Sequence, residues 1–422
     1  MVSRLRFLRN RISERLWVKP LLMCLLSIAA SFIARVADHI DISLLVPDIT
    51  SQSVNTLLSV MASSMLVIAT FSVASMVSAY ASASRTATPR SFYLVIADDA
   101  SQNALSVFIG AFIFSIVALI AVENSYYDKS GRFTLFVLTL AIFAIVITTF
   151  ARWVDRVARL GRLETTIAKV ETATAVALRQ RRCAPNLGGV PVVSRQDTVK
   201  SIYGTSVGYV QRVDVTALQK FAERSRVHIE VAALPGTFIS PGRTLAHVVT
   251  EPGSPTGIEI DRIAQAFVIG NKRTFDEDPR FGLITLSEIA SRALSPGIND
   301  PGTAIEVIGT LVRLFTHWSE PVEEHDLQAG ECDRIAVPEI SLQDMFEDAF
   351  RPIARDGAGT IEVVVRLQKA FESLATIEDA TMRDVAMQNA RWALQRAENT
   401  LKFPNDLEVA RECVEFAMPD AS

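Results

Sequence analysis

The sequence predicts an α-helical membrane domain of four transmembrane helices, followed by a cytosolic α+β domain. The first supporting observation is a charge-free window of 36 residues, Ile49 to Ser84. This window contains the apolar run Leu57 to Tyr80, whose 24 residues form a helix about 36 Å long. Such a helix is long enough to cross a hydrocarbon core of about 30 Å, and a soluble domain has no need of it.

The second observation is that hydropathy and charge divide the chain. Mean hydropathy is +0.27 overall, but the apolar residues are concentrated in the first 150. Residues 1–182 carry a net charge of +8, and residues 183–422 carry −12. A basic half beside an acidic half fits a bilayer anchor with a cytosolic domain. The acidic half argues against nucleic-acid binding, which needs a basic patch.

The transmembrane domain is expected at residues 1–151. Its predicted spans are Pro20–Ile40, Leu57–Tyr80, Ala100–Val122 and Phe133–Ala151. Threading them through a bilayer puts twelve Lys and Arg on the side of both termini and two on the other side. Positive residues are retained in the cytoplasm, so we expect both termini to be cytoplasmic.

Two features of the spans allow alternative interpretations. Arg35 near the end of the first span either extends to the interface and pairs with Asp38, or lines a watery cavity as part of an ion path. Hydroxyl residues of the second span form either a helix-packing face or a pore lining. The candidates for this face are Ser64, Ser72, Ser75 and Ser78.

A connecting helix is expected at residues 152–182, followed by a Pro- and Gly-containing linker. Its apolar positions repeat at a spacing of three and four, which is close to a heptad seam. The seam either packs on the protein's own soluble domain or pairs with neighbouring subunits, and we expect a homo-oligomer.

Residues 192–270 predict a small β-rich subdomain, either a barrel or a sandwich. Short strands are expected at Tyr209–Val213, Val227–Leu234, Phe238–Ser240 and Thr244–Thr250, with two Pro-Gly turns between them. Asp214 is placed as the N-cap of a short helix ending at Ser225.

Residues 271–422 predict a helical subdomain. Asp-Pro pairs at 278–279 and 300–301 each start a helix, and further amphipathic helices follow from about Leu342. The Pro, Glu and Asp content of Ser319–Ile340 predicts an exposed connector.

The densest polar cluster surrounds these two helix starts. Caps and turns explain its members in structural terms, whereas a shared ligand pocket is the functional alternative. The five candidates are Asp276, Asp278, Arg292, Asn299 and Asp300.

Motifs for catalysis or for cofactor binding are absent from the sequence. It contains no GxSxG, no HExxH and no Walker lysine, and its five histidines are scattered. The four cysteines have no short-spaced pair, which argues against a zinc or redox site. We therefore expect no catalytic residues, no metal and no cofactor.

The stretch ALSPGINDPGTA, at 293–304, resembles the signature of a family of bacterial predicted membrane proteins known only as a domain of unknown function. The segments SVGYVQRVDVTAL and PGTFISPGRTLAHV and the four-span N-terminal part are also similar to this family. The resemblance implies an inner-membrane protein with a cytosolic α+β domain, and it transfers no activity.

Two functions remain open from the sequence. The first is an oligomeric, channel-like protein gated by its cytosolic domain. The second is a non-conducting scaffold or sensor that binds a ligand or a partner through that domain. A membrane-bound enzyme is the weakest of the hypotheses.

Overall fold

The computed structural model describes residues 18–36, 38, 47–86, 88–96, 99–159, 162–193, 199–250, 259–323, 325–327 and 330–418. The chain divides into two compact units, Met1–Thr166 (unit 1) and Ile167–Ser422 (unit 2). Each unit has its own hydrophobic core.

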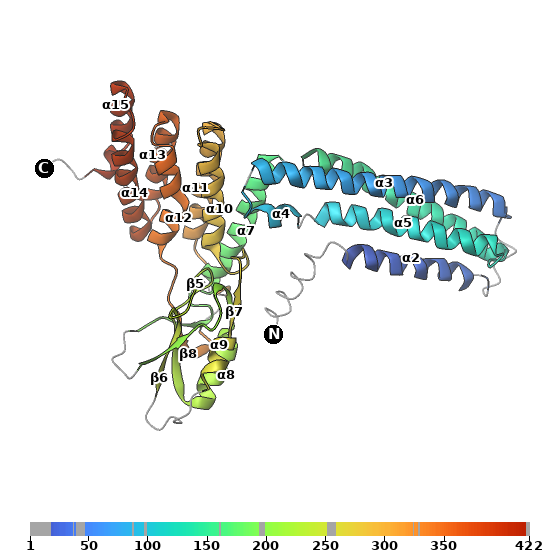
Figure 1. The fold of residues 1–422 in the computed structure, drawn as a ribbon, viewed down its shortest axis with the longest axis horizontal. Coiled ribbons are helices and arrows are strands. Elements are labelled where there is room, and N and C mark those ends of the chain that lie inside the picture. The colour runs from blue at the N-terminus through green and yellow to red at the C-terminus, as the bar shows by residue number, and fades with distance from the viewer. Residues whose placement is uncertain are drawn as a thin grey trace. The chain divides into compact units, whose positions relative to one another are not determined.

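Unit 1 is helical, and its long helices run alongside one another (Figure 1). They are α2 (Val18–Val36), α3 (Ser51–Thr86), α4 (Phe92–Ile96), α5 (Asp99–Glu123) and α6 (Lys129–Arg159). Four of them, α2, α3, α5 and α6, are long and apolar enough to cross a membrane. Helix α3 continues to Thr86, so it takes up part of the connector that the sequence suggested from Ala81 onward.

The interior of unit 1 is built around α5, which contacts α2, α3 and α6. Phe108 and Phe114 of this helix are fully buried. The outer surface is equally apolar: Leu25 is 59% exposed and Val67 is 66% exposed. Soluble proteins rarely expose continuous apolar surface of this kind, whereas a bilayer covers it.

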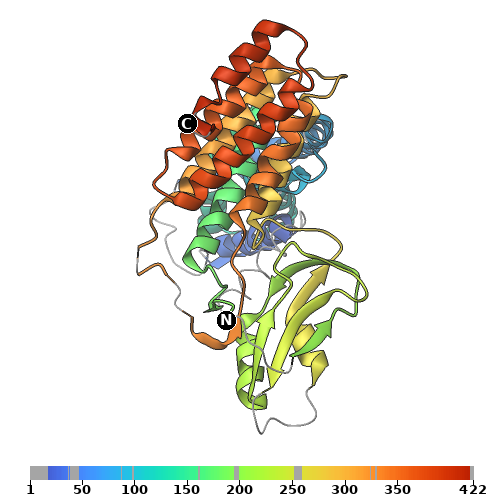
Figure 2. The same cartoon turned by 90° about the vertical axis from the view of Figure 1, so that its left-hand side faces the viewer.

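Unit 2 contains two open sheets (Figure 2). The larger sheet has the order β1-β8-β4-β6-β2, and the smaller has the order β5-β3-β7. The strands are β1 (Gly189–Val190), β2 (Val199–Tyr203), β3 (Gly208–Val213), β4 (Val227–Val231), β5 (Phe238–Ile239), β6 (Thr244–Thr250), β7 (Phe267–Gly270) and β8 (Cys332–Ala336).

The β-rich part differs from the expected one in two respects. Neither sheet closes on itself among the described strands, so a barrel is not confirmed. Strand β8 lies within the segment Ser319–Ile340 that was expected to be an exposed connector, and it pairs in parallel with β4 through Ile229 and Ile335. Only Cys332 and Ile335 of β8 are buried, which is too few apolar positions for a clear strand pattern.

The short helices beside the sheets are α8 (Val215–Ser225) and α9 (Ile260–Gln265). The predicted cap of α8 is confirmed, because the Asp214 side chain accepts a hydrogen bond from the Ala217 N–H. Alternate buried residues of β3 and β4 face the same core as α8.

The remaining helices of unit 2 pack side by side, with the strands beyond one end of them (Figures 1 and 2). They are α10 (Pro279–Ala293), α11 (Pro301–Ser319), α12 (Leu342–Asp356), α13 (Ile361–Ala375), α14 (Ala380–Glu398), α15 (Pro404–Glu412) and the 3₁₀ turn η2 (Glu415–Ala417). Four phenylalanine rings, with centroids 4.4 to 6.4 Å apart, form the centre of their core: Phe315, Phe346, Phe350 and Phe371.

The connecting helix α7 (Leu163–Cys183) packs within unit 2. Its seam residues Ile167, Val170, Thr174 and Ala177 are all at least 98% buried. Thr174 lies so close to Gly282 of α10 that a Cβ atom on the glycine would overlap it. The chain itself therefore covers these four residues. Of the two other predicted seam residues, Leu163 is partly exposed and Leu160 lies outside the described residues.

Candidate functional site

A cleft of about 550 Å³ lies in unit 2 where the sheets meet the helices. Three segments distant in sequence line it: the loop from β4 to β6, the start of α10, and the chain that leads into α12. The polar lining residues are Thr237, Ser240, Arg243, Arg273, Asp278, Arg280, Glu339, Ser341 and Asp344. Such a volume suits a small-molecule ligand.

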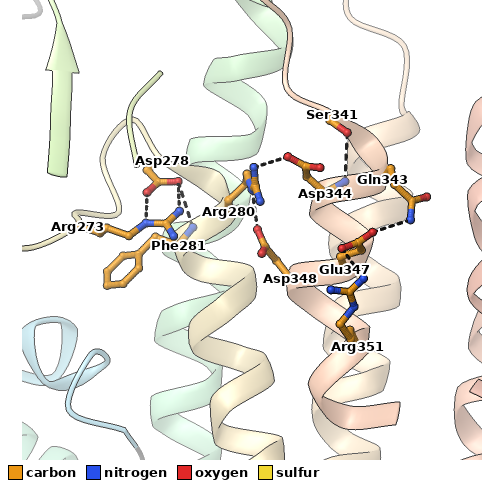
Figure 3. Close-up of polar contacts among 10 residues, drawn as sticks. All are labelled: Arg273, Asp278, Arg280, Phe281, Ser341, Gln343, Asp344, Glu347, Asp348 and Arg351. Atoms are coloured by element: carbon orange, nitrogen blue, oxygen red, sulfur yellow. Dashed lines mark hydrogen bonds and ion pairs between the residues drawn. The ribbon is translucent and has the colours of Figure 1, made fainter. Parts of the chain in front are cut away.

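Asp278 and Arg273 form a buried ion pair in the cleft wall (Figure 3). Arg273 donates from Nε and Nη2 to the two carboxylate oxygens at 2.7 and 2.9 Å. Asp278 is 2% exposed and also accepts from the Phe281 N–H at 3.2 Å, which caps α10. Burial raises the pKa of Asp278, and the bonds from Arg273 act in the opposite direction.

The Pro235-Gly236 turn packs directly against this ion pair. The Thr237 N–H donates to the Leu234 carbonyl at 3.0 Å. Pro235 and Gly236 therefore occupy the two central positions of a β-turn. Gly236 has a φ of +94°, as the third position of a type II turn requires. A Cβ on Gly236 would overlap the Asp278 carboxylate, so both backbone and space demand glycine here.

Arg280 connects the start of α10 to α12 (Figure 3). It donates from Nε to Asp348 at 2.6 Å and from Nη1 to Asp344 at 2.7 Å. The hydroxyl of Ser341 caps α12 by accepting from the Asp344 N–H at 3.2 Å. The two carboxylates lie one helical turn apart, so one guanidinium reaches both and its plane is fixed.

The structure does not bring the five predicted cluster residues together. Asp276 and Asp278 precede α10, whereas the other three lie around its far end, and a helix of 15 residues is about 22 Å long. Only Asp278 lines the cleft. The structure therefore does not gather the five predicted residues into one pocket: Asp276, Asp278, Arg292, Asn299 and Asp300.

At the far end of α10, the turn is built by Asn299 and Asp300. Asn299 has a φ of +51°, a left-handed conformation that asparagine tolerates better than most residues. Asp300 caps α11 through the Thr303 N–H at 3.1 Å. Hydrogen bonds from Thr303 lower the pKa of Asp300. Capping accounts for both residues, and a binding role for them stays a prediction.

The four candidate serines of α3 occupy different environments. Ser72 is fully buried and Ser75 is half-buried, whereas Ser64 and Ser78 are exposed on the outside of unit 1. They do not form one continuous face within a single chain. The choice between packing face and pore lining stays open.

Arg35 and Asp38 both contact the α5–α6 turn. Arg35 donates to the Tyr126 carbonyl at 3.0 Å and stacks on the Tyr126 ring, 3.7 Å from its centroid. Asp38 accepts from the Asp128 N–H at 3.1 Å and from the Gly131 N–H, at the start of α6. Both residues thus tie the end of α2 to this turn.

Two residues of the cleft, Arg273 and Arg280, had no assigned role in the sequence, and Gly236 was predicted only as part of a Pro-Gly turn. Arg280 finds its acids 64 and 68 residues further along, a distance that no local pattern reveals. The available signal was the spacing of Asp344 and Asp348, which places both carboxylates on one helix face. Among the described residues, no group of three or more His, Cys, Asp or Glu is arranged to hold a metal ion.

Comparison with known proteins identifies the family. The family described as "Predicted membrane protein (DUF2254)" matches residues 13–373. Uncharacterized protein MT1328 of Mycobacterium tuberculosis (strain CDC 1551) is 39% identical over 104 residues, or 24% of this chain and 20% of that protein. Uncharacterized protein Mb1321c of Mycobacterium bovis is 38% identical over the same length.

The match spans about a fifth of the length of these relatives. No solved structure matches the chain. The family match covers most of the chain and agrees with the four apolar helices of unit 1 and with the signature around the α10–α11 turn. The chain therefore belongs to the DUF2254 family of predicted membrane proteins.

Proposed function

We propose that the protein is a membrane-anchored sensor whose unit 2 binds a small ligand in the cleft. The cleft carries the proposal, because it combines ligand-sized volume with polar groups from three separate segments. Its position between the sheets and the helices would let a ligand affect how these two parts of unit 2 pack.

Two of the three arginines that line the cleft, Arg273 and Arg280, are held in place before any ligand arrives. Arg273 and Arg280 each use Nε and one terminal nitrogen to bind an acid. A guanidinium has five N–H donors, so each side chain retains donors for a ligand. Because their planes are already held, little side-chain entropy is lost on binding.

Binding fits the lining better than catalysis does. Ser240 and Ser341 are the two serines of the lining and therefore its candidate nucleophiles. The hydroxyl of Ser341 is already engaged in capping α12. The lining contains no histidine, cysteine or lysine that would activate them. We therefore propose a binding protein and not an enzyme.

A channel-like oligomer is the second candidate, and one observation favours it. Ser64 and Ser78 of α3 are exposed among apolar side chains, as are Ser59, Ser63 and Thr70 of the same helix. In an assembly, these hydroxyl groups would face a neighbouring subunit or a water-filled opening. Flux across liposomes that contain the purified protein tests this candidate.

Ligand binding is tested by thermal unfolding of the full chain in detergent. The probe is a panel of nucleotides, amino acids, di- and tricarboxylates and sugar phosphates. A compound at a hundredfold excess over its Kd stabilises the folded state by about 2.7 kcal/mol, so we expect at least one to raise the Tm by about 5–10 °C.

The specific variant is Ala232→Trp, which fills the cleft from an exposed lining position. The matched control is Ala380→Trp, at an exposed alanine on α14 outside the cleft. We expect the Tm response to disappear in Ala232→Trp and to persist in the control. No response in the wild type, or an equal response in both variants, contradicts the proposal.

A further inference from the structure

Arg181, near the end of α7, is a buried cation whose terminal nitrogens have no acceptor. The residue is 3% exposed. Among the described residues, none accepts a hydrogen bond from Nη1 or Nη2. Removing such donors from water without compensation is costly, and more so for a charged group.

Two neighbouring arginines of α7, unlike Arg181, have hydrogen-bond or ion-pair partners. Arg179 is largely exposed and pairs with Asp326 at 3.3 Å. Arg182 donates to the Glu320 carbonyl at 3.0 Å and lies over the Trp318 ring. Of these three arginines of α7, only Arg181 is buried.

Two carboxylates are near enough to act on Arg181 electrostatically, Glu277 and Asp278. Both are already engaged by other residues. Glu277 pairs with Arg212 of β3, with Arg212 Nε 3.3 Å from Glu277 Oε1. Asp278 is held by both bonds from Arg273. Arg181 therefore lies in the electrostatic field of both carboxylates but forms no ion pair with either of them.

The segment between β7 and α10, which carries Glu277 and Asp278, contains a second polar group without a hydrogen-bond partner among the described residues. The hydroxyl of Thr274 is buried and has no hydrogen-bond partner among the described residues. It lies three residues before Glu277, in the segment between β7 and α10. A planar guanidinium with free terminal nitrogens matches the geometry of an oxyanion.

We propose that Arg181 is the centre of a buried binding site for a small oxyanion such as phosphate or sulfate, beneath the start of α10. The bound anion accepts hydrogen bonds from Nη1 and Nη2 and neutralises the guanidinium. It joins α7 to the loop that carries the Arg273–Asp278 pair. The site is separate from the cleft and does not rest on the proposed sensor function.

Glu277 makes the binding depend on pH. The groups that face it are Arg212 of β3, Arg181 of α7, the neighbouring Asp276, and the Val213 backbone. Burial raises the pKa of Glu277 to about 7, against the effect of Arg212 and Arg181. A nearby anion raises this pKa further, so binding takes up a proton and strengthens as the pH falls.

The test is calorimetric titration of the full chain in detergent with sulfate, which does not titrate in this range. Ionic strength is held constant with sodium chloride. We expect saturable binding that is several-fold, and at most about tenfold, tighter near pH 6 than near pH 8, on either side of the Glu277 pKa of about 7. Absence of saturable sulfate binding overturns the proposal.

Three variants separate this site from non-specific effects. Arg181→Met removes the charge at similar length and should abolish sulfate binding, whereas Arg179→Met on the same helix should leave it unchanged. Glu277→Gln should bind sulfate with little dependence on pH. Equal binding by Arg181→Met and the wild type, or an unchanged pH dependence in Glu277→Gln, overturns the site.

The Glu277→Gln arm remains decisive if Arg181→Met fails to fold. Retention of sulfate binding in Ala232→Trp is also expected, because that substitution fills only the cleft. If sulfate binds and no compound binds in the cleft, the result supports the Arg181 site and leaves the sensor function unsupported. If a compound binds in the cleft and sulfate does not bind, the sensor function is supported and the Arg181 site is overturned.

Discussion

Units 1 and 2 satisfy their buried polar groups in different ways. In unit 1, three buried hydroxyls bond within their own helix: Ser106 donates to the Gln102 carbonyl, Ser115 to the Ala111 carbonyl and Thr139 to the Leu135 carbonyl, each at 2.7 Å. The buried Tyr127 hydroxyl is an exception, because it donates to the Ser31 carbonyl of α2 at 2.8 Å. In unit 2, buried charges bond between elements, as Arg212 of β3 does with Glu277. The three intrahelical hydroxyls therefore add little to helix association in unit 1, whereas the buried charges of unit 2 define how the sheets meet the helices.

The largest effect is expected where a buried charge loses its partner. Asp278→Ala leaves Arg273 buried without its carboxylate and removes the cap of α10. Breaking a buried pair in this way costs about 3–5 kcal/mol of unfolding free energy. Denaturant unfolding of the full chain, followed by a probe in unit 2, measures the loss.

The control is Asp300→Ala, which removes a comparable cap at a more accessible position and should cost only about 1 kcal/mol. Equal losses for the two variants would show that the Arg273–Asp278 pair contributes no more than a cap. The stronger contribution that we expect from bonds between elements of unit 2 would then be contradicted for the Arg273–Asp278 pair.

A smaller effect is expected at the Pro235-Gly236 turn. Gly236→Ala meets the Asp278 carboxylate, whereas Gly242→Ala has a similar φ of +85° and open space around it. The left-handed backbone costs each variant about 1–2 kcal/mol, and the overlap adds about 1–3 kcal/mol to Gly236→Ala alone. Thermal unfolding of the pair isolates the overlap; indistinguishable Tm values would mean that the turn moves freely away from Asp278.

The pH dependence of unit 2 is the next smaller effect. The pKa of Glu277 is about 7 in the folded chain and 4.5 as the ordinary value. Between these values the folded state holds more protons than the unfolded state, so this residue's contribution to stability falls as the pH rises and levels off above about 7.

Measuring unfolding free energy against pH for the wild type and Glu277→Gln isolates this contribution, because other groups cancel in the difference. The wild type should lose stability relative to the variant from about pH 4.5 to about pH 7. A constant difference, or one with the opposite slope, would show that Glu277 ionises normally.

The smallest effect is expected in unit 1. Ser115→Ala removes a buried hydroxyl that bonds only to its own helix. Because no other helix loses a partner, the cost should be within about 0.5 kcal/mol. Refolding from sodium dodecyl sulfate into detergent micelles measures it. A loss of about 2 kcal/mol or more would mean that hydroxyls do hold these helices together.

Local patterns in the sequence predicted the elements better than their contacts. Apolar length alone identified the four long helices of unit 1. Asp-Pro pairs located the starts of α10 and α11, because an aspartate cap and a proline at the first helical position act within one turn. These signals depend on neighbouring residues and need no knowledge of the fold.

Features that depend on residues far apart in the sequence could not be predicted from local patterns. Strand β8 is short, and it becomes a strand because β1 and β4 flank it. The seam of α7 has the same period whether it packs on α10 or on another subunit. The cleft draws on residues from Ala232 to Asp344, and only the folded chain brings them together.

The central prediction from the sequence is that unit 1 crosses the membrane four times and that unit 2 lies in the cytoplasm. Cysteine labelling in intact cells tests it after the native cysteines are replaced, with single cysteines placed at Asn124 in the α5–α6 turn and at Ala380 of α14. A membrane-impermeant maleimide should label Asn124→Cys in intact cells and Ala380→Cys only after the membrane is permeabilised. Labelling of Ala380→Cys in intact cells would contradict the account.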